Sequence, residues 1–264
     1  MSSPEVGAYC FDLDGTLYVR DAAVPGAVAM LGRLRQRGIP FRCLSNTTSR
    51  PRAALAARLR SYGFDVAEEE LLTAPLAGAA LLRKRGHRSV APFVPEATHA
   101  DLAGFRLVGC TAGGHQPAGA PDAVLIGDLG AAWTDALLQE AFRYLMAGAD
   151  FVACSRDRYW LGATGLVMDC GAYVAGLEHA TGRAAAIAGK PGAAFFEAAL
   201  ESLGGPPAAS VAMVGDDPWS DVAGAQAAGM RGWLVATGKF PPEAIGGTGV
   251  TPDRMLASVA HLPD

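Results

Sequence analysis

The chain has 264 residues, of which 50% are hydrophobic and 18% charged, and its formal net charge is −4. The hydrophobic share excludes an intrinsically disordered protein, and the charge argues against a dedicated nucleic-acid binder. No run of about 18 uninterrupted apolar residues occurs, so no membrane span is expected, and the N-terminus lacks a signal-peptide pattern. We expect a globular, soluble, cytoplasmic protein.

Short apolar runs alternate with longer helical patterns, which is typical of βαβ units around a parallel sheet. The first section predicts strands at 6–13 and 39–44 and helices at 25–37 and 50–62. The middle section predicts helices at 76–85, 134–147 and 170–181 and strands at 89–94, 123–126 and 150–154. The last section predicts strands at 184–188, 209–214 and 232–235 and helices at 193–203, 221–228 and 252–261.

Two residue types give weaker signals. Five cysteines without CxxC or Cys/His ligand spacing indicate free, buried thiols in a reducing compartment and no zinc site. The region from Ala22 to Phe64 carries eight arginines and no acid. These arginines are either solvated helix faces or the source of a mild positive field for an anionic substrate.

The strongest chemical signal is the run Phe11-Asp12-Leu13-Asp14-Gly15-Thr16-Leu17 at the end of the first predicted strand. Ligands of open α/β sheets bind at the carboxyl ends of the strands. Two carboxylates there can hold a divalent cation and divide the roles of nucleophile and acid/base. The alternative is a simple Asx turn at a strand end.

Three further polar clusters follow predicted strands. Ser45 and Asn46 close the second strand and offer a hydroxyl and an amide to phosphate oxygens, although both types also cap helices. Lys190, in Gly-Lys-Pro-Gly, is either an exposed loop lysine or an ammonium aimed at an anion. The last cluster supplies three acids within six residues, where hard cations are commonly held: Asp216, Asp217 and Asp221.

The order of these signals resembles the four motifs of the haloacid dehalogenase superfamily of phosphohydrolases. The long insertion between Ser45 and Lys190 resembles the large α/β cap of its subfamily IIA. The resemblance covers nearly the whole chain, and the segments YWLGATGLVMDCGAYVAGLEHATG, GKPGAAFFEAAL and TGKF look most like the phospholysine phosphohistidine inorganic pyrophosphate phosphatase group. That group has a serine where this chain has Asp14, so its substrate range need not be shared.

The resemblance implies an α/β fold with a Rossmann-like parallel sheet core at 1–76 and 183–264 and an inserted α/β cap domain at 77–182. It also implies a Mg²⁺-dependent phosphatase in which Asp12 is the nucleophile and Asp14 the general acid/base. Lys190, Ser45 and Asn46 would bind the phosphoryl group. The implied metal residues are Asp12, Asp14 through its backbone carbonyl, Asp216, and Asp221 or Asp217 orienting the metal's waters, of which Asp221 fits the family spacing better.

The substrate is expected to be a small phosphorylated metabolite, including pyrophosphate or phosphoamino compounds. Sugar phosphates, nucleotides, phosphoglycolate and pyridoxal phosphate are alternatives, because cap loops select the leaving group. Asp128, Arg156 and Arg158 are candidate cap contacts or ordinary turn and surface residues. No nucleic-acid or membrane partner is expected, and the cap resemblance suggests a homodimer.

Two other classes of function are weighed against this one. A halide-cleaving hydrolase would need neither a metal nor a second acid, so Asp14 and Asp216 argue against it. A non-catalytic binding protein is disfavoured because the whole set of motifs is intact.

Overall fold

The chain forms two compact units, of which the computed structural model describes residues 6–109, 119–162, 165–238 and 242–263. The first, here called the core unit, comprises Met1–Ser45, Arg52–Leu72 and Lys190–Asp264. The second, the cap unit, comprises Asn46–Pro51 and Thr73–Gly189. Within the described ranges, no helix is both long and apolar enough to cross a membrane.

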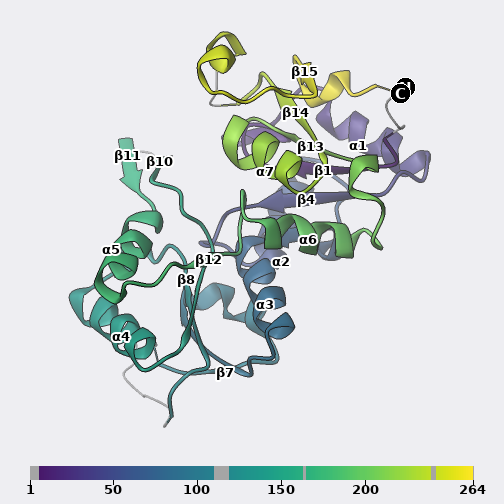
Figure 1. Cartoon of the computed structure of the whole chain (residues 1–264). Coiled ribbons are helices and arrows are strands. Elements are labelled where there is room, and N and C mark those ends of the chain that lie inside the picture. Colours follow the sequence, from purple (N-terminus) through teal and green to yellow (C-terminus); the bar gives the residue numbers. More distant parts are fainter. Residues whose placement is uncertain (1–5, 110–118, 163–164, 239–241, 264) are drawn as a thin grey trace. The chain divides into compact units, whose positions relative to one another are not determined.

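The core unit is built on a six-stranded sheet (Figure 1). Its neighbouring strands are parallel from β15 to β4, as the βαβ pattern predicts. All five residues of the central strand β1 are buried, which explains its uninterrupted apolar sequence. In spatial order the strands are β15 (Arg254–Leu256), β14 (Arg231–Val235), β13 (Val211–Gly215), β1 (Ala8–Asp12), β4 (Phe41–Ser45) and β5 (Leu71–Thr73).

Helices pack on this sheet through one continuous apolar cluster. Tyr9 and Phe11 of β1 project into the cluster because they are two residues apart on a strand. The cluster also takes in buried leucines of α1 (Ala27–Gln36) and α2 (Arg52–Ser61) and Met30 of α1. Two further helices, α6 (Ala193–Ser202) and α7 (Gly224–Ala227), contact β4 and β14.

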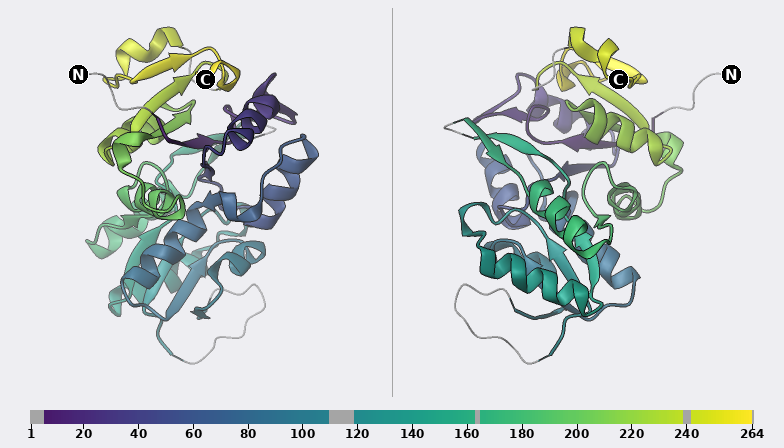
Figure 2. Two further views of the ribbon diagram at one scale, coloured as in Figure 1. Left: turned by 90° about the vertical axis from the view of Figure 1, so that its right-hand side faces the viewer. Right: turned by 60° about the vertical axis from the view of Figure 1, so that its left-hand side comes forward.

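The cap unit has its own five-stranded parallel sheet. Helices α4 (Asp135–Met146) and α5 (Gly171–Thr181) lie side by side and bury Leu145 and Val174 against it (Figure 2). Helix α3 (Ala74–Lys84) contacts the sheet at Leu125, so closely that a Cβ on Gly78 would come within 2.9 Å of that side chain. The strands in spatial order are β12 (Ala186–Ile187), β9 (Asp150–Ala153), β8 (Ala123–Ile126), β6 (Ser89–Phe93) and β7 (Arg106–Leu107).

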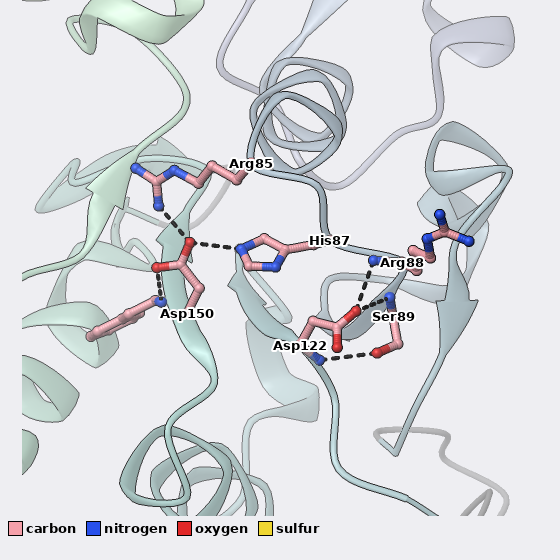
Figure 3. A network of polar contacts seen from close by, with 7 residues as sticks. Arg85, His87, Arg88, Ser89, Asp122 and Asp150 are labelled. Atoms are coloured by element: carbon pink, nitrogen blue, oxygen red, sulfur yellow. Dashed lines mark hydrogen bonds and ion pairs between the residues drawn. The ribbon is translucent and has the colours of Figure 1, made fainter.

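Two carboxylates connect the amino-terminal ends of these cap strands through hydrogen bonds and ion pairs (Figure 3). Asp122 accepts hydrogen bonds from the backbone N–H groups of Arg88 and Ser89, at 2.7 and 2.8 Å. Asp150 pairs with Arg85 at 2.6 Å and with the ring of His87 at 3.0 Å. The start of β6 is thereby joined to the starts of β8 and β9.

Two arginines of the basic region between Ala22 and Phe64 have structural partners. The Arg58 guanidinium lies over the Tyr18 ring at 4.7 Å and pairs with Asp21. Arg35 lies over the Phe41 ring at 5.2 Å and also pairs with Glu70. Arg35 and Arg58 thus have a structural role in addition to the two interpretations offered by the sequence.

The structure corrects two predicted elements. The strand expected at 184–188 was assigned to the catalytic core, but Ala186–Ile187 pairs with β9 in the cap sheet. The helix expected at 252–261 is wrong, because Arg254–Leu256 is a strand parallel to β14 and Val259–His261 is a single 3₁₀ turn. The edge strands β5 and β7 were not predicted, nor were two antiparallel hairpins, β2 (Tyr18–Val19) with β3 (Ala22–Ala23) and β10 (Tyr159–Gly162) with β11 (Gly165–Met168).

Candidate functional site

The candidate site lies at the carboxyl end of the core sheet, where β1 and β13 run side by side. The register pairs Phe11 with Val214, so Asp12 is level with Gly215 and one position from Asp216. On the other side of β1, Asp12 pairs with Leu44, which places Ser45 at the same edge of the sheet. Parallel strands thus bring residues that are far apart in sequence to one place.

Lys190 forms the centre of the site. Its Nζ lies 2.5 Å from Oδ1 of Asp12 and 2.7 Å from Oδ1 of Asp221. The lysine is only 3% exposed and Asp221 only 1%. The alternative of an exposed loop lysine is therefore wrong for Lys190.

Three buried carboxylates converge beside this ammonium. One oxygen from each of Asp12, Asp216 and Asp221 lies within 4.8 Å of the others. Two glycines make room for Asp216, because a Cβ on Gly15 or Gly238 would come within 2.6 or 1.9 Å of its Oδ2. Gly15 also needs its freedom for the turn after β1, since its φ is 87°.

The pKa values of the acids reflect both burial and charge. Burial raises the pKa of Asp12 from 3.8 to about 6, with the Lys190 ammonium opposing the shift and Asp216 adding to it. Burial likewise raises the pKa of Asp221 to about 6. Burial alone would lower the pKa of Lys190, but the facing carboxylates of Asp12 and Asp221 outweigh it and raise that pKa. The Lys190 ammonium is thus shared between the carboxylates of Asp12 and Asp221, while Asp216 repels Asp12.

Asp217 and Asp221 have different positions. Oδ1 of Asp217 accepts the N–H groups of Trp219 and Ser220, both at 2.9 Å, and so caps the π-helical turn Pro218–Ala223. Asp221 faces Lys190 with one oxygen and accepts the N–H of Asp217 at 3.1 Å with the other. Asp221 is thus the acid that the structure brings to Asp12, and Asp217 is a helix cap.

Asp14 and Asn46 differ from the buried acids Asp12, Asp216 and Asp221: the first is exposed, and the second belongs to the cap unit. Asp14 is exposed, in the turn that follows β1, and its charge is the second cause, after burial, that raises the pKa of Tyr18 to about 12. Asn46 belongs to the cap unit, where its amide donates to Asp157 at 3.2 Å. No local pattern in the sequence indicates this contact with Asp157.

The candidate cap residues have local partners within the cap unit. The Asp128 carboxylate accepts the N–H of Gly130 at 2.7 Å, and Arg156 pairs with Glu178. Arg156 and Arg158 also line an open pocket of about 580 Å³. Its other lining residues are Tyr159, Met168, Gly171, Ala172 and Ala175.

Sequence reasoning missed the loop after β14 as part of the site. Thr237 donates its hydroxyl to the carbonyl of Gly15 at 2.6 Å, and Gly238 lies against Asp216. The same signal that marked the other motifs, a polar turn at a predicted strand end, is present at Thr237 and Gly238. Lys239 and Phe240 of the TGKF segment lie outside the described residues, as does Cys110, whereas the four described cysteines are free and buried.

The donor set suits a hard cation. Asp12, Asp216 and Asp221 present only carboxylate oxygens, the ligand type that Mg²⁺ and Ca²⁺ prefer. A divalent ion held there would also offset the repulsion between the Asp12 and Asp216 carboxylates. The site can thus combine a buried carboxylate, an ammonium and a cation around an anionic substrate.

Comparisons with known proteins agree with this geometry. A family model described as "Haloacid dehalogenase-like hydrolase" matches residues 9–106, and a HAD-hydrolase-like model matches residues 187–262. The solved structure of NagD from E. coli K-12 has a TM-score of 0.86 and 27% identity, covering 98% of this chain and 99% of that one. For p-nitrophenyl phosphatase from Archaeoglobus fulgidus, the TM-score is 0.87 with 28% identity, covering 97% and 98%.

Two groups of relatives match nearly end to end. Haloacid dehalogenase-like hydrolase domain-containing protein 2 of Rattus norvegicus is 39% identical, over 88% of this chain and 85% of its own length. Phospholysine phosphohistidine inorganic pyrophosphate phosphatase of Homo sapiens is 30% identical, over 96% of this chain and 91% of its own. The chain therefore belongs to the haloacid dehalogenase-like hydrolases, among the phosphatases of subfamily IIA.

Proposed function

We propose that this phosphatase hydrolyses small phosphorylated metabolites with the help of Mg²⁺ and through an aspartyl-phosphate on Asp12. The observation that carries the proposal is the position of the Lys190 Nζ, 2.5 Å from Asp12 within a group of three buried carboxylates. An ammonium this close to the Asp12 carboxylate can also attract a phosphoryl oxygen, and so hold the carboxylate near the phosphorus.

The nucleophilic step must overcome repulsion between the Asp12 carboxylate and an anionic phosphate. At about 4 Å and an effective dielectric constant near 20, each pair of unit charges costs about 4 kcal/mol. Lys190 offsets part of this cost because its ammonium already contacts Asp12. An Asp12 oxygen then forms a bond to phosphorus while the bond to the leaving oxygen breaks, and Asp14 gives its proton to that oxygen.

The second step returns the enzyme to its starting state. Asp14, now ionised, takes a proton from a water molecule, whose oxygen forms a bond to phosphorus. The bond between phosphorus and Asp12 breaks, so phosphate is released and Asp14 is protonated again. Its exposed position in the turn after β1 gives Asp14 access to water for this role.

The residues that would hold Mg²⁺ are the carboxylates of Asp12 and Asp216 and the backbone carbonyl of Asp14. When bound, Mg²⁺ neutralises charge on the phosphoryl oxygens. Asp221 contacts Lys190 and would orient the water molecules of a bound ion, while Ser45 and Asn46 would bind phosphate oxygens.

The substrate class rests on the relatives and on the cap. The names of two similar proteins specify p-nitrophenyl phosphate and phospholysine, phosphohistidine or pyrophosphate. We propose a small phosphorylated molecule of this range, selected by the cap unit, with no nucleic-acid or membrane partner and with a homodimer formed through the cap. The buried free thiols support a cytoplasmic location.

Phosphate release from p-nitrophenyl phosphate tests the proposal. Activity should disappear when divalent ions are chelated with EDTA and return when Mg²⁺ is added in excess. Full activity after thorough chelation would contradict the metal role of Asp216. A panel of phosphorylated metabolites would then rank the substrates.

A further inference from the structure

The segment that follows β4 is attached to the cap unit. β4 ends at Ser45 in the core unit, the next six residues belong to the cap unit, and α2 begins at Arg52 in the core unit again. The turn at Ser45 and Asn46, which we propose to bind phosphate, is therefore continuous with a short piece of cap structure.

Thr48 holds this segment to the cap sheet. Its side chain is buried, and its Oγ1 accepts the backbone N–H of Asp128 at 2.9 Å. It lies against Gly127, where a Cβ would come within 3.2 Å of Cβ and Cγ2 of Thr48 and within 2.7 Å of Cγ1 of Val94. Gly127 is itself fixed, because its N–H donates to the carbonyl of Phe93 at 2.9 Å.

A second contact holds the same segment two residues earlier. The Asn46 amide donates to the Asp157 carboxylate at 3.2 Å, and the N–H of Asp157 donates to Ser155 at 2.9 Å. The Asn46 oxygen also lies against Gly189, where a Cβ would come within 2.8 Å of it. The segment is thus held at two points, by the residues after β8 and by those after β9.

We propose that Thr48 is a positioning residue, which fixes the phosphate-binding turn of Ser45 and Asn46 by anchoring it to the end of β8 in the cap unit. The inference rests on the proposed function. Without the Thr48 hydroxyl, the part-buried N–H of Asp128 loses its acceptor, and the turn loses this attachment to the cap unit. Phosphate binding is then weakened more than the chemical step, because the Thr48 hydroxyl bonds to Asp128 whereas Lys190 holds the reacting Asp12.

Kinetics of Thr48→Val, which keeps the shape of the side chain and removes the acceptor, test this role. We expect KM for p-nitrophenyl phosphate and the inhibition constant of inorganic phosphate to rise about tenfold each, with a smaller change in kcat, since a misplacement of about 1 Å can cost up to 10²-fold. Thr48→Ser, which keeps the hydroxyl, should restore both constants to within about threefold of the wild type.

Thr134→Val is the matched control. Thr134 accepts the N–H of Leu137 at 3.3 Å as the cap of α4 in the same unit, so this variant loses a similar hydrogen bond elsewhere. It should lower Tm and leave both constants unchanged. If Thr48→Val does not fold, Gly127→Ala takes its place. Its new methyl group would lie 2.7 Å from Cγ1 of Val94 and 3.2 Å from Thr48, so both side chains must shift and the same constants should rise.

The outcomes separate the two proposals. A folded Thr48→Val protein with KM and phosphate inhibition like those of the wild type overturns the role of Thr48, and so does an unchanged Gly127→Ala protein. Absence of phosphatase activity in the wild type would instead contradict the proposed function.

Discussion

Lys190 shows how composition and geometry point to the same residue. The chain has 22 basic residues, of which only three are lysines, and Lys190 is buried between two carboxylates. An ammonium is compact and can direct its three protons to separate acceptors, whereas a guanidinium is planar and larger. The site therefore depends on this cation for its shape as well as for its charge.

Lys190→Arg should lower kcat by about 10²-fold, because the charge is kept while the contacts to Asp12 and Asp221 are displaced by about 1 Å. Tm should fall by only a few degrees, as expected for a modest overpacking. Steady-state kinetics check this expectation. The control is Lys84→Arg at the exposed end of α3, which should leave kcat unchanged. A Lys190→Arg enzyme within about threefold of wild-type kcat would mean that only the charge matters.

A substitution at Gly238 tests whether the position of the Asp216 carboxylate matters for metal binding. A methyl group there would lie 1.9 Å from the Asp216 oxygen, so Gly238→Ala should displace that carboxylate. We expect the Mg²⁺ concentration for half-maximal activity to rise about tenfold, as for other residues that support metal ligands. Gly246→Ala, where a Cβ meets open space, should change nothing. Equal Mg²⁺ dependence in the two variants would separate Gly238 from metal binding.

At this scale the sequence could predict which acids and which lysine would meet, because each follows a predicted strand. The local pattern does not separate Asp217, which caps a helix, from Asp221, which faces Lys190, since both acids stand in the same short turn; the resemblance to the superfamily favoured Asp221. Nor could it predict the contact of Asn46 with Asp157, 111 residues away, which depends on tertiary structure.

Among the elements, long periodic helices and buried strands were the most predictable. Strand β8 matches its predicted range, α5 differs from its range by one residue at the start, and α4 differs by one residue at each end. The errors fall on short segments at sheet edges. Residues 186–187 form a strand as predicted, but its partner β9 is in the cap sheet, which no local pattern reveals. The C-terminal segment has helical spacing, yet Arg254–Leu256 pairs with β14.

The polar group at the start of the cap strands makes a prediction about pH. Partial burial would raise the pKa of Asp150, but the hydrogen bonds from Arg85 and His87 outweigh it and lower that pKa. Because the pKa of Asp150 is lowered in the folded state, its ionised carboxylate stabilises the fold fully at pH values above the ordinary pKa of 3.8. This stabilisation is lost as the pH falls below 3.8 and through the lowered pKa.

Asp150→Asn should therefore lower Tm by about 2–4 °C at pH 7, with the difference shrinking below about pH 4. Thermal melts from pH 7 to 3 measure this. Asp21→Asn, at a carboxylate that is 95% exposed, should show little difference at any pH. A deficit of Asp150→Asn that persists undiminished at pH 3 would rule out an electrostatic cause.

For the whole molecule, one chain builds two units by leaving the core after Ser45 and returning finally at Lys190. Ser45 and Lys190, the core residues at these two divisions, are themselves residues of the proposed site. The insertion of a cap and its approximate place follow from the resemblance to the superfamily. The predicted limits at 76/77 and 182/183 differ from the divisions at Leu72/Thr73 and Gly189/Lys190.

Metal binding should stabilise the whole fold. A ligand that binds only the folded state at ten times its Kd adds about 1.4 kcal/mol, which would raise Tm by about 3–6 °C for a chain of this size. We expect this shift with Mg²⁺ in scanning fluorimetry and its loss in Asp216→Asn. KCl at equal ionic strength is the control, and an equal shift with KCl would indicate a general salt effect.

The most direct test of the account is the identity of the phosphorylated residue during turnover. Wild-type protein mixed with Mg²⁺ and substrate, quenched in acid and analysed by mass spectrometry, should carry one phosphoryl group on the peptide that contains Asp12. Asp12→Asn should fold, carry none and release no phosphate. A phosphoryl group on another residue, or full turnover by Asp12→Asn, would contradict the assignment of Asp12 as the nucleophile.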